Sequence, residues 1–255
     1  SREEIPVWIL DRPNPAGGDY VSGWILEEEH KSFVGMYPIP IAHGMTLGEL
    51  ARMMTGEQWL EFENEPDIRV IEMSGWNRAM KWPDTGLEWT PPSPNLPTFE
   101  HSYAYLGTCL IEGTSLSEGR GTPDPFITIG SPTTSINSEQ LERLNKLPGI
   151  ELELIRFVPE SIPGKALNPK HEGKECTGLQ LSITDYQEYD PVGSGLILLR
   201  VLMQSTDGSE INPFIKRLAG TDQIEIFLSE SESHSKPQFF LDDFIEKREK
   251  YLLYH

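Results

Sequence analysis

An apolar run at the start of the chain constrains the fold most. Ile5 to Leu10 (IPVWIL) is apolar without interruption and ends at Asp11, the pattern of a strand buried on both faces of a parallel sheet. The run therefore predicts an interior strand of an α/β fold. Such a strand needs neighbours, for which residues 33–41 and 68–73 are the best candidates in the following ninety. Because SREE alone precedes the run, we expect the chain to begin inside a domain.

The segment after this run is a candidate ligand-binding loop. In open parallel sheets, ligands bind outside the carboxyl ends of the strands, where Asp11 to Pro15 (DRPNP) lies. Its two prolines fix their own backbone and restrict the residues that precede them, so Arg12 and Asn14 are held rigidly. We take both as candidates for substrate binding. The alternative is a stiff loop that packs under another loop.

Composition limits the partners of the chain. Forty acidic and 21 basic residues give a formal charge of -19, which repels a nucleic-acid backbone. An anionic small ligand can still bind, because one guanidinium in a cleft outweighs screened surface charge. No apolar run approaches the roughly 18 residues that a membrane span needs. Cys109 and Cys176 lack CxxC spacing, and both a disulfide and two free thiols remain open.

A helix is predicted after residue 45. Thr46 and Glu49 have the spacing of a capping box, and a helix through about Met54 would place Leu47, Leu50 and Met54 on one face. His43 lies just before this helix, whose partial positive charge disfavours the imidazolium. His43 is therefore a candidate to polarise or bind an anionic group, the alternative being a structural hydrogen bond.

A tryptophan- and proline-rich stretch from Met73 to Pro97 is the best domain boundary. We predict domains at residues 1–92 and 93–255. Indole faces with polar neighbours suit sugar rings, although one or two of the three tryptophans are expected in the core. Asn95, between two prolines, is a rigidly presented amide and a further candidate for substrate binding.

Patterns beyond the boundary predict both helices and strands. Helices are expected at 98–105, 137–147, 190–203 and 237–254, and strands at 152–158 and 179–184. The class of fold is thus α/β throughout.

A glycine-rich stretch from Gly107 to Phe126 combines carboxylates, hydroxyls and one arginine. Motifs for dinucleotide, P-loop, zinc-protease and serine-hydrolase sites are missing from the sequence. The remaining groups suit carbohydrates, and glycoside hydrolysis needs two positioned carboxyl groups. We therefore take Glu112 and Glu118 as the candidate catalytic pair and Arg120 as a binding residue, without metal or cofactor. An ion pair that pins the loop is an equally favoured reading of Arg120.

Several longer motifs resemble one enzyme family, the NamZ-type exo-β-N-acetylmuramidases. They are DRPNP (11–15), SFVGMYPIPIAHGMTLGELA (32–51), PPSPNLPT (91–98), LIEGTSLSEGRGT (110–122), LAGTD (218–222) and REKYLLY (248–254). They occur in the same order and reach from near the start of the chain to its end.

The resemblance implies a Rossmann-like domain followed by a smaller C-terminal α/β (α+β) domain, with the active site in the cleft between them. Residues 1–92 would be the C-terminal portion of the Rossmann-like domain, lacking the family's N-terminal part. The implied activity is release of N-acetylmuramic acid from the non-reducing ends of peptidoglycan fragments, in the periplasm or outside the cell.

The family's proposed catalytic Glu lies in a Pro-Glu-His-Gly motif that does not occur in this sequence. An alternative function is therefore a carbohydrate-binding or structural fragment that needs the N-terminal segment or a partner chain. Whether the chemistry is retaining or inverting stays open.

Overall fold

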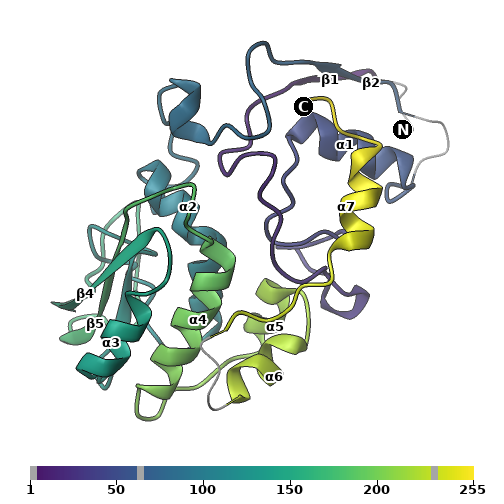
Figure 1. Ribbon diagram of the computed structural model, residues 1–255. Coiled ribbons are helices and arrows are strands. Elements are labelled where there is room, and N and C mark those ends of the chain that lie inside the picture. Colours follow the sequence, from purple (N-terminus) through teal and green to yellow (C-terminus); the bar gives the residue numbers. More distant parts are fainter. Residues whose placement is uncertain (1–4, 62–65, 231–234) are drawn as a thin grey trace. The chain divides into compact units, whose positions relative to one another are not determined.

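The chain forms two compact units, shown in a computed structural model that describes residues 5–61, 66–230 and 235–255 (Figure 1). Unit 1 comprises Ser1–Ser22, Ala42–Glu88 and Phe239–His255, and unit 2 comprises Gly23–Ile41 and Trp89–Gln238. A single boundary at 92/93 would assign residues 23–41 and 239–255 to the opposite units. The predicted α/β fold class is confirmed.

Unit 1 contains a parallel pair of strands, β1 (Val7–Leu10) and β2 (Ile68–Ile71), together with α1 (Leu47–Gly56), the 3₁₀ helix η2 (Trp82–Thr85) and α7 (Asp242–Glu249). Val7 pairs with Ile68 and Leu10 with Ile71. The predicted strand and its parallel pairing are confirmed.

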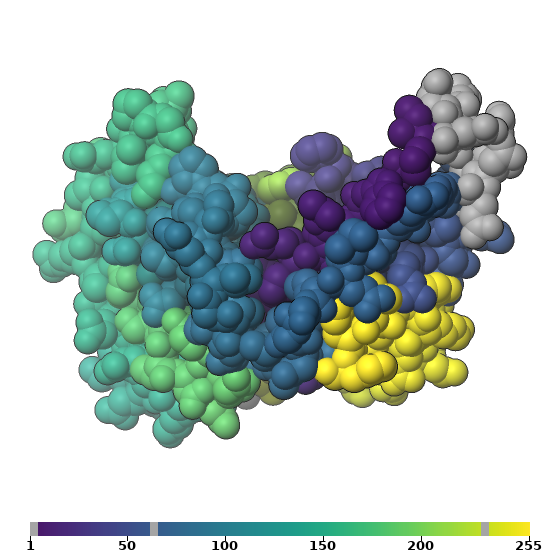
Figure 2. Space-filling model, turned by 90° about the horizontal axis from the view of Figure 1, so that it is seen from above, coloured from purple at the N-terminus to yellow at the C-terminus, as the bar shows by residue number. Residues whose placement is uncertain are grey.

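The predicted interior position of β1 is wrong. In the described residues its sheet has two strands, and Leu10 is 71% exposed. Figure 2 shows this purple N-terminal segment at the surface, beside blue residues of the same unit. An apolar run predicts burial on both faces, but burial requires covering elements on both sides, and β1 has one partner strand.

Helix α1 begins as predicted. The Thr46 side chain accepts the Glu49 N–H, and the Glu49 carboxylate accepts the Thr46 N–H at 2.9 Å. Of the predicted apolar face, Leu50 and Met54 are half-buried but Leu47 is exposed, whereas Met53 and Glu49 are fully buried. Polar contacts of the first turn set which face of the helix is buried, and the spacing of apolar residues does not show these contacts.

Unit 2 contains an antiparallel sheet in the order β3-β5-β4 among the residues described. Its strands are β3 (Thr128–Ser131), β4 (Ile150–Phe157) and β5 (Cys176–Ile183). Its helices are α2 (Phe99–Thr108), α3 (Ser138–Leu144), α4 (Pro191–Gln204), α5 (Phe214–Ala219) and α6 (Gln223–Ser229), with the 3₁₀ helices η1 (Glu28–His30) and η3 (Cys109–Gly113). The predicted elements at 98–105, 137–147, 152–158, 179–184 and 190–203 are confirmed.

Helix α4 is the core of unit 2, and α2 packs against it. The two backbones meet at Gly107 and Gly195: a Cβ on Gly107 would lie 2.0 Å from the Pro191 carbonyl oxygen. The glycine at the start of the predicted polar loop therefore serves helix packing.

Two predicted elements differ from the structure. Residues 33–41 form no strand, and Ser32 and Gly35 pair across a tight turn that leaves Phe33 fully exposed. The prolines in this segment lack the N–H groups that a strand ladder uses. The C-terminal helix is confined to Asp242–Glu249, because residues before it connect the two units and Tyr254 turns back to a buried partner.

Candidate functional site

Asp11 organises the loop that follows β1. Its buried carboxylate accepts hydrogen bonds from the Gly48 N–H at 2.9 Å and from the Thr46 and Tyr254 hydroxyls at 2.7 Å each. The Gly48 N–H belongs to the first turn of α1, where a negative charge is favoured. The DRPNP loop is thereby fixed to the start of the helix.

Asn14 and His43 lie close together in unit 1. The Asn14 amide donates to the Met45 carbonyl at 3.0 Å and accepts the Ala16 N–H, while His43 Nδ1 accepts the Met45 N–H at 3.1 Å. Burial, and then the charge of Arg248, lower the pKa of His43 to about 4. The predicted preference for neutral imidazole agrees in direction. His43 is therefore a neutral donor through Nε2 at pH 7.

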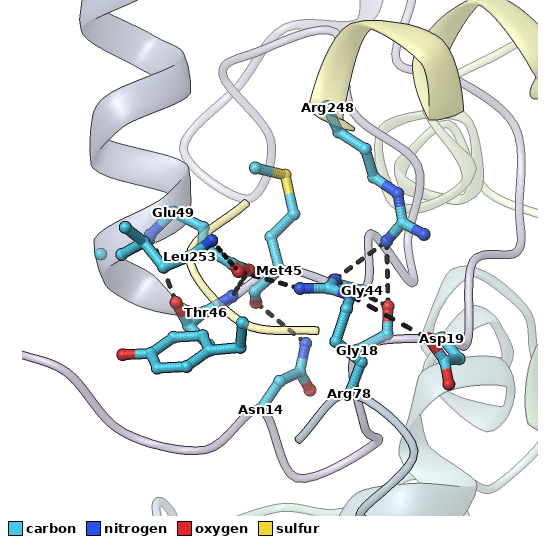
Figure 3. A network of polar contacts seen from close by, with 12 residues as sticks. Asn14, Gly18, Asp19, Gly44, Met45, Thr46, Glu49, Arg78, Arg248 and Leu253 are labelled. Carbon is cyan, nitrogen blue, oxygen red and sulfur yellow. Dashed lines mark hydrogen bonds and ion pairs between the residues drawn. The ribbon is translucent and has the colours of Figure 1, made fainter. Parts of the chain in front are cut away.

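Two buried arginines hold the backbone around these residues (Figure 3). Arg78 pairs with Glu49 at 2.8 Å, and Arg78 and Arg248 both donate to the carbonyl oxygens of Gly18 and Gly44. Glu49 Oε1 also accepts the Leu253 N–H. The ion pair with Glu49 offsets the burial of the Arg78 charge, while Arg248 Nε is buried without a hydrogen-bond partner among the described residues.

A pocket of about 320 Å³ opens beside the DRPNP loop in unit 1. Its lining includes Arg12, Pro13, Met73, Trp76, Met80 and Leu87. The Arg12 side chain is exposed, and its guanidinium has no hydrogen bond or ion pair with the residues that the structure describes. Mostly apolar walls with a few polar groups are typical of small-molecule sites.

The glycine-rich stretch of unit 2 holds a charge cluster. Arg120 donates from Nε and Nη2 to Glu112 Oε1 at 3.0 and 2.7 Å, and its Nε lies 3.6 Å from Glu118 Oε1. Lys170 Nζ lies 2.9 Å from the other Glu118 oxygen. The Arg120 guanidinium also stacks over the Phe126 ring. The cluster brings the predicted pair Glu112 and Glu118 together, with Arg120 between them.

Asn95 also belongs to unit 2. Its side chain is buried, and its Nδ2 donates to the Lys165 carbonyl at 2.8 Å. Its Oδ1 is buried without a hydrogen-bond partner among the described residues. The amide that the sequence predicts to be presented to a ligand is therefore buried, and its role in substrate binding stays a prediction.

The structure thus groups the predicted site residues by unit: Arg12, Asn14 and His43 in unit 1, and Glu112, Glu118 and Arg120 in unit 2. Sequence reasoning missed the residues that hold these groups in place. They are Asp11, Glu49, Arg78, Arg248, Tyr254 and Lys170. Signals for four of them were present: Asp11 lies in the DRPNP motif, Glu49 in the motif of residues 32–51, and Arg248 and Tyr254 in REKYLLY. Arg78 and Lys170 lie outside the quoted motifs.

Cys109 and Cys176 are buried free thiols. Burial raises the pKa of the Cys109 thiol to about 12, which disfavours the reactive thiolate. Among the helices within the described ranges, none is long and apolar enough to cross a bilayer.

Two family models match the chain. That of the N-terminal domain of the exo-β-N-acetylmuramidase NamZ matches residues 1–100, and that of its C-terminal domain matches residues 103–254. The peptidoglycan β-N-acetylmuramidase NamZ of Bacillus subtilis (strain 168) is 40% identical over 260 residues. That match covers 98% of this chain, which spans 60% of the relative's length.

Two crystal structures of DUF1343 family proteins from Bacteroides fragilis NCTC 9343 are also similar. They are 35% and 25% identical, with TM-scores of 0.82 and 0.85. Each match covers all of this chain and 67% of the solved one.

Proposed function

Because the chain belongs to the NamZ family of exo-β-N-acetylmuramidases, we propose that it is part of a glycosidase that releases N-acetylmuramic acid from the non-reducing ends of peptidoglycan fragments. The observation that carries the proposal is the 40% identity to a peptidoglycan β-N-acetylmuramidase over 98% of the chain. The geometry supports it with a pocket and with two neighbouring carboxylates. A periplasmic or extracellular location belongs to the same proposal.

Glu112 and Glu118 are the proposed carboxyl pair for the chemistry. Both approach the same Arg120 nitrogen within 3.6 Å, so the two carboxylates are neighbours. The guanidinium occupies the space between them, and glycoside hydrolysis places the scissile bond between its two carboxyl groups. Arg120 would therefore have to swing away before this pair could act, which makes its displacement part of the proposal.

The substrate-binding residues proposed from the sequence are Arg12, Asn14, His43, Asn95 and Arg120. Asn14 binds backbone groups through both ends of its amide, so we propose that it shapes the loop beneath the sugar. His43 offers an Nε2–H to a hydroxyl or carbonyl oxygen. The resemblance also implies a site in the cleft between the family's two domains, and the proposal includes this.

The alternative is a binding or structural fragment that needs a further segment or a partner chain for catalysis. The family's Pro-Glu-His-Gly motif does not occur in this sequence, which spans 60% of the length of its Bacillus subtilis relative. Incubating the purified chain with an aryl β-N-acetylmuramide, and with the matching glucosaminide as control, separates the two functions. Selective release of the aryl group supports a glycosidase. Binding of the muramide without release supports a binding fragment. If the chain neither binds nor cleaves the muramide, a structural fragment is the function that fits.

A further inference from the structure

We propose that the pocket of unit 1 binds the lactyl arm of an N-acetylmuramic acid residue, and that Arg12 binds its carboxylate. The identity of the sugar rests on the proposed function. The class of ligand, a carboxylate on a short and partly apolar arm, rests on the pocket itself.

Arg12 is an available guanidinium on a rigid loop. Its backbone N–H donates to Asp11 at 3.1 Å, and Pro13 follows it, so its Cα is fixed while its side chain stays exposed. The other arginines that line buried parts of unit 1, Arg78 and Arg248, use their guanidinium groups on backbone carbonyls. A free planar fork on a fixed backbone suits bidentate binding of a carboxylate.

The pocket walls match the rest of the arm. Met73, Trp76 and Met80 contribute apolar surface, and a volume of about 320 Å³ is at the small end of ligand pockets. It suits a substituent or one sugar ring better than a chain of sugars. The Trp76 indole N–H is buried without a partner among the described residues, so this wall contains a donor that the described protein leaves unused.

Asp11 also lines the pocket, and its charge opposes an anionic ligand. Its carboxylate is, however, already bound by two hydroxyls and two backbone N–H groups. These donors satisfy its lone pairs, and the start of α1 stabilises its negative charge. The charge that a ligand meets at the rim of the pocket is therefore set by the positive guanidinium of Arg12.

Arg120 is the other candidate to bind the lactyl carboxylate. It offers the same chemistry, but Glu112 accepts from two of its nitrogens and Phe126 covers its face. Binding a ligand there requires breaking an existing ion pair. Among the described residues, Arg12 has no such partner to lose.

The test is calorimetric titration of N-acetylmuramic acid and of N-acetylglucosamine, which lacks the lactyl group. Wild type is compared with Arg12→Gln, Arg12→Lys and Arg120→Lys. Arg52→Gln is the matched control, since Arg52 is an exposed arginine of the same unit on α1, away from the pocket lining. Circular dichroism confirms that each variant is folded.

We expect Arg12→Gln to weaken muramic acid binding roughly ten- to a hundredfold, the value of a hydrogen-bonded charge, and to leave N-acetylglucosamine within about threefold. Arg12→Lys should lose part of this preference, because an ammonium cannot form the parallel pair. Arg52→Gln should change neither affinity.

The proposal is overturned if Arg12→Gln weakens both sugars equally, if Arg120→Lys alone removes the preference, or if the wild type does not prefer muramic acid. Since binding needs no turnover, the result is independent of the proposed hydrolysis. A chain that prefers muramic acid through Arg12 but releases no aryl group would support this inference while contradicting catalysis by the chain alone.

Discussion

In unit 1, burial sets the protonation state of single residues more than their neighbours in sequence do. His43 is the clearest case. Its Nδ1 accepts a backbone N–H, and Arg248 donates to its own carbonyl oxygen at 3.3 Å. A protonated imidazole there would lose the first bond and face a buried cation. His43 is therefore neutral in the folded protein, and the folded state loses stability at low pH.

Protonation of His43 should couple stability to pH. The folded-state pKa of about 4 lies below the unfolded value of about 6.5, so between these values the unfolded chain binds a proton that the folded chain does not. The free energy of unfolding should fall as pH is lowered from about 6.5 to 4, by roughly 3 kcal/mol from this group. Urea denaturation at pH 7, 6 and 5 measures it.

The variant that checks this prediction is His43→Asn, which keeps an acceptor near the Nδ1 position but does not titrate. Its stability should depend less on pH over the same range. Burial lowers the pKa of His101 as well, so His101→Asn is the matched control and should remove a separate part of the slope. Identical slopes for wild type and His43→Asn would contradict the assignment.

At the scale of elements, Tyr254 joins three segments of unit 1. Its hydroxyl donates to Asp11 at 2.7 Å and accepts the Met73 N–H at 3.0 Å, while its ring meets Trp76 edge to face. Asp11, Met73 and Trp76 all line the proposed pocket. Tyr254 therefore holds the Asp11 side and the Met73 side of the pocket together.

Tyr254→Phe should keep the ring contact and lose both hydrogen bonds. We expect a loss of about 2 to 3 kcal/mol in the free energy of unfolding, because one acceptor is a buried carboxylate, together with weaker muramic acid binding. Tyr251→Phe is the control: it removes one hydrogen bond to Glu57 at a less buried position and should cost under about 1 kcal/mol. Equal losses in urea denaturation would contradict the wall-joining role.

The helix pair of unit 2 depends on a missing side chain. Gly107→Ala should force α2 away from α4, because the new methyl meets backbone atoms that cannot turn aside, and should cost about 2 to 3 kcal/mol. Gly208→Ala is the contrast, since its Cβ would meet open space but its φ of 67° is strained, at about 1 kcal/mol. Thermal unfolding separates the two; a smaller loss for Gly107→Ala would contradict close packing.

These elements show what the sequence could and could not predict. Local signals predict several elements correctly: the capping box at Thr46, the helix at 190–203 and the strands at 152–158 and 179–184. The partners of site residues were not, because Asp11 and Tyr254 lie 243 positions apart and no local pattern connects them. Apolarity also misled where covering elements decide burial, at β1 and at the exposed Phe33. From the sequence, Arg120 could either stabilise the loop through an ion pair or bind the ligand. The observed ion pair with Glu112 supports the stabilising role.

At the scale of the whole molecule, the order of the chain and the order of its compact units differ. The chain leaves unit 1 after Ser22, returns at Ala42, leaves again after Glu88 and returns at Phe239. The last of these returns supplies α7, Arg248 and Tyr254. Unit 1 is therefore completed by the final residues of the chain, whereas the sheet and the helices α2 and α4 of unit 2 lie entirely between residues 99 and 204.

Deleting Phe239–His255 should consequently unfold unit 1 in preference to unit 2. The deletion leaves Glu49 and the Gly18 and Gly44 carbonyls with Arg78 but without Leu253 and Arg248, and it removes the Tyr254 donor to Asp11. Each lost hydrogen bond that involves a charged group costs about 1.5 to 3 kcal/mol, and these losses together approach the whole stability of a typical domain. Hydrogen exchange should show lost amide protection in α1 and β2, with protection retained in β5 and α4. Loss in all four elements would mean that the units unfold as one, and retention in all four would mean that the terminal segment is dispensable.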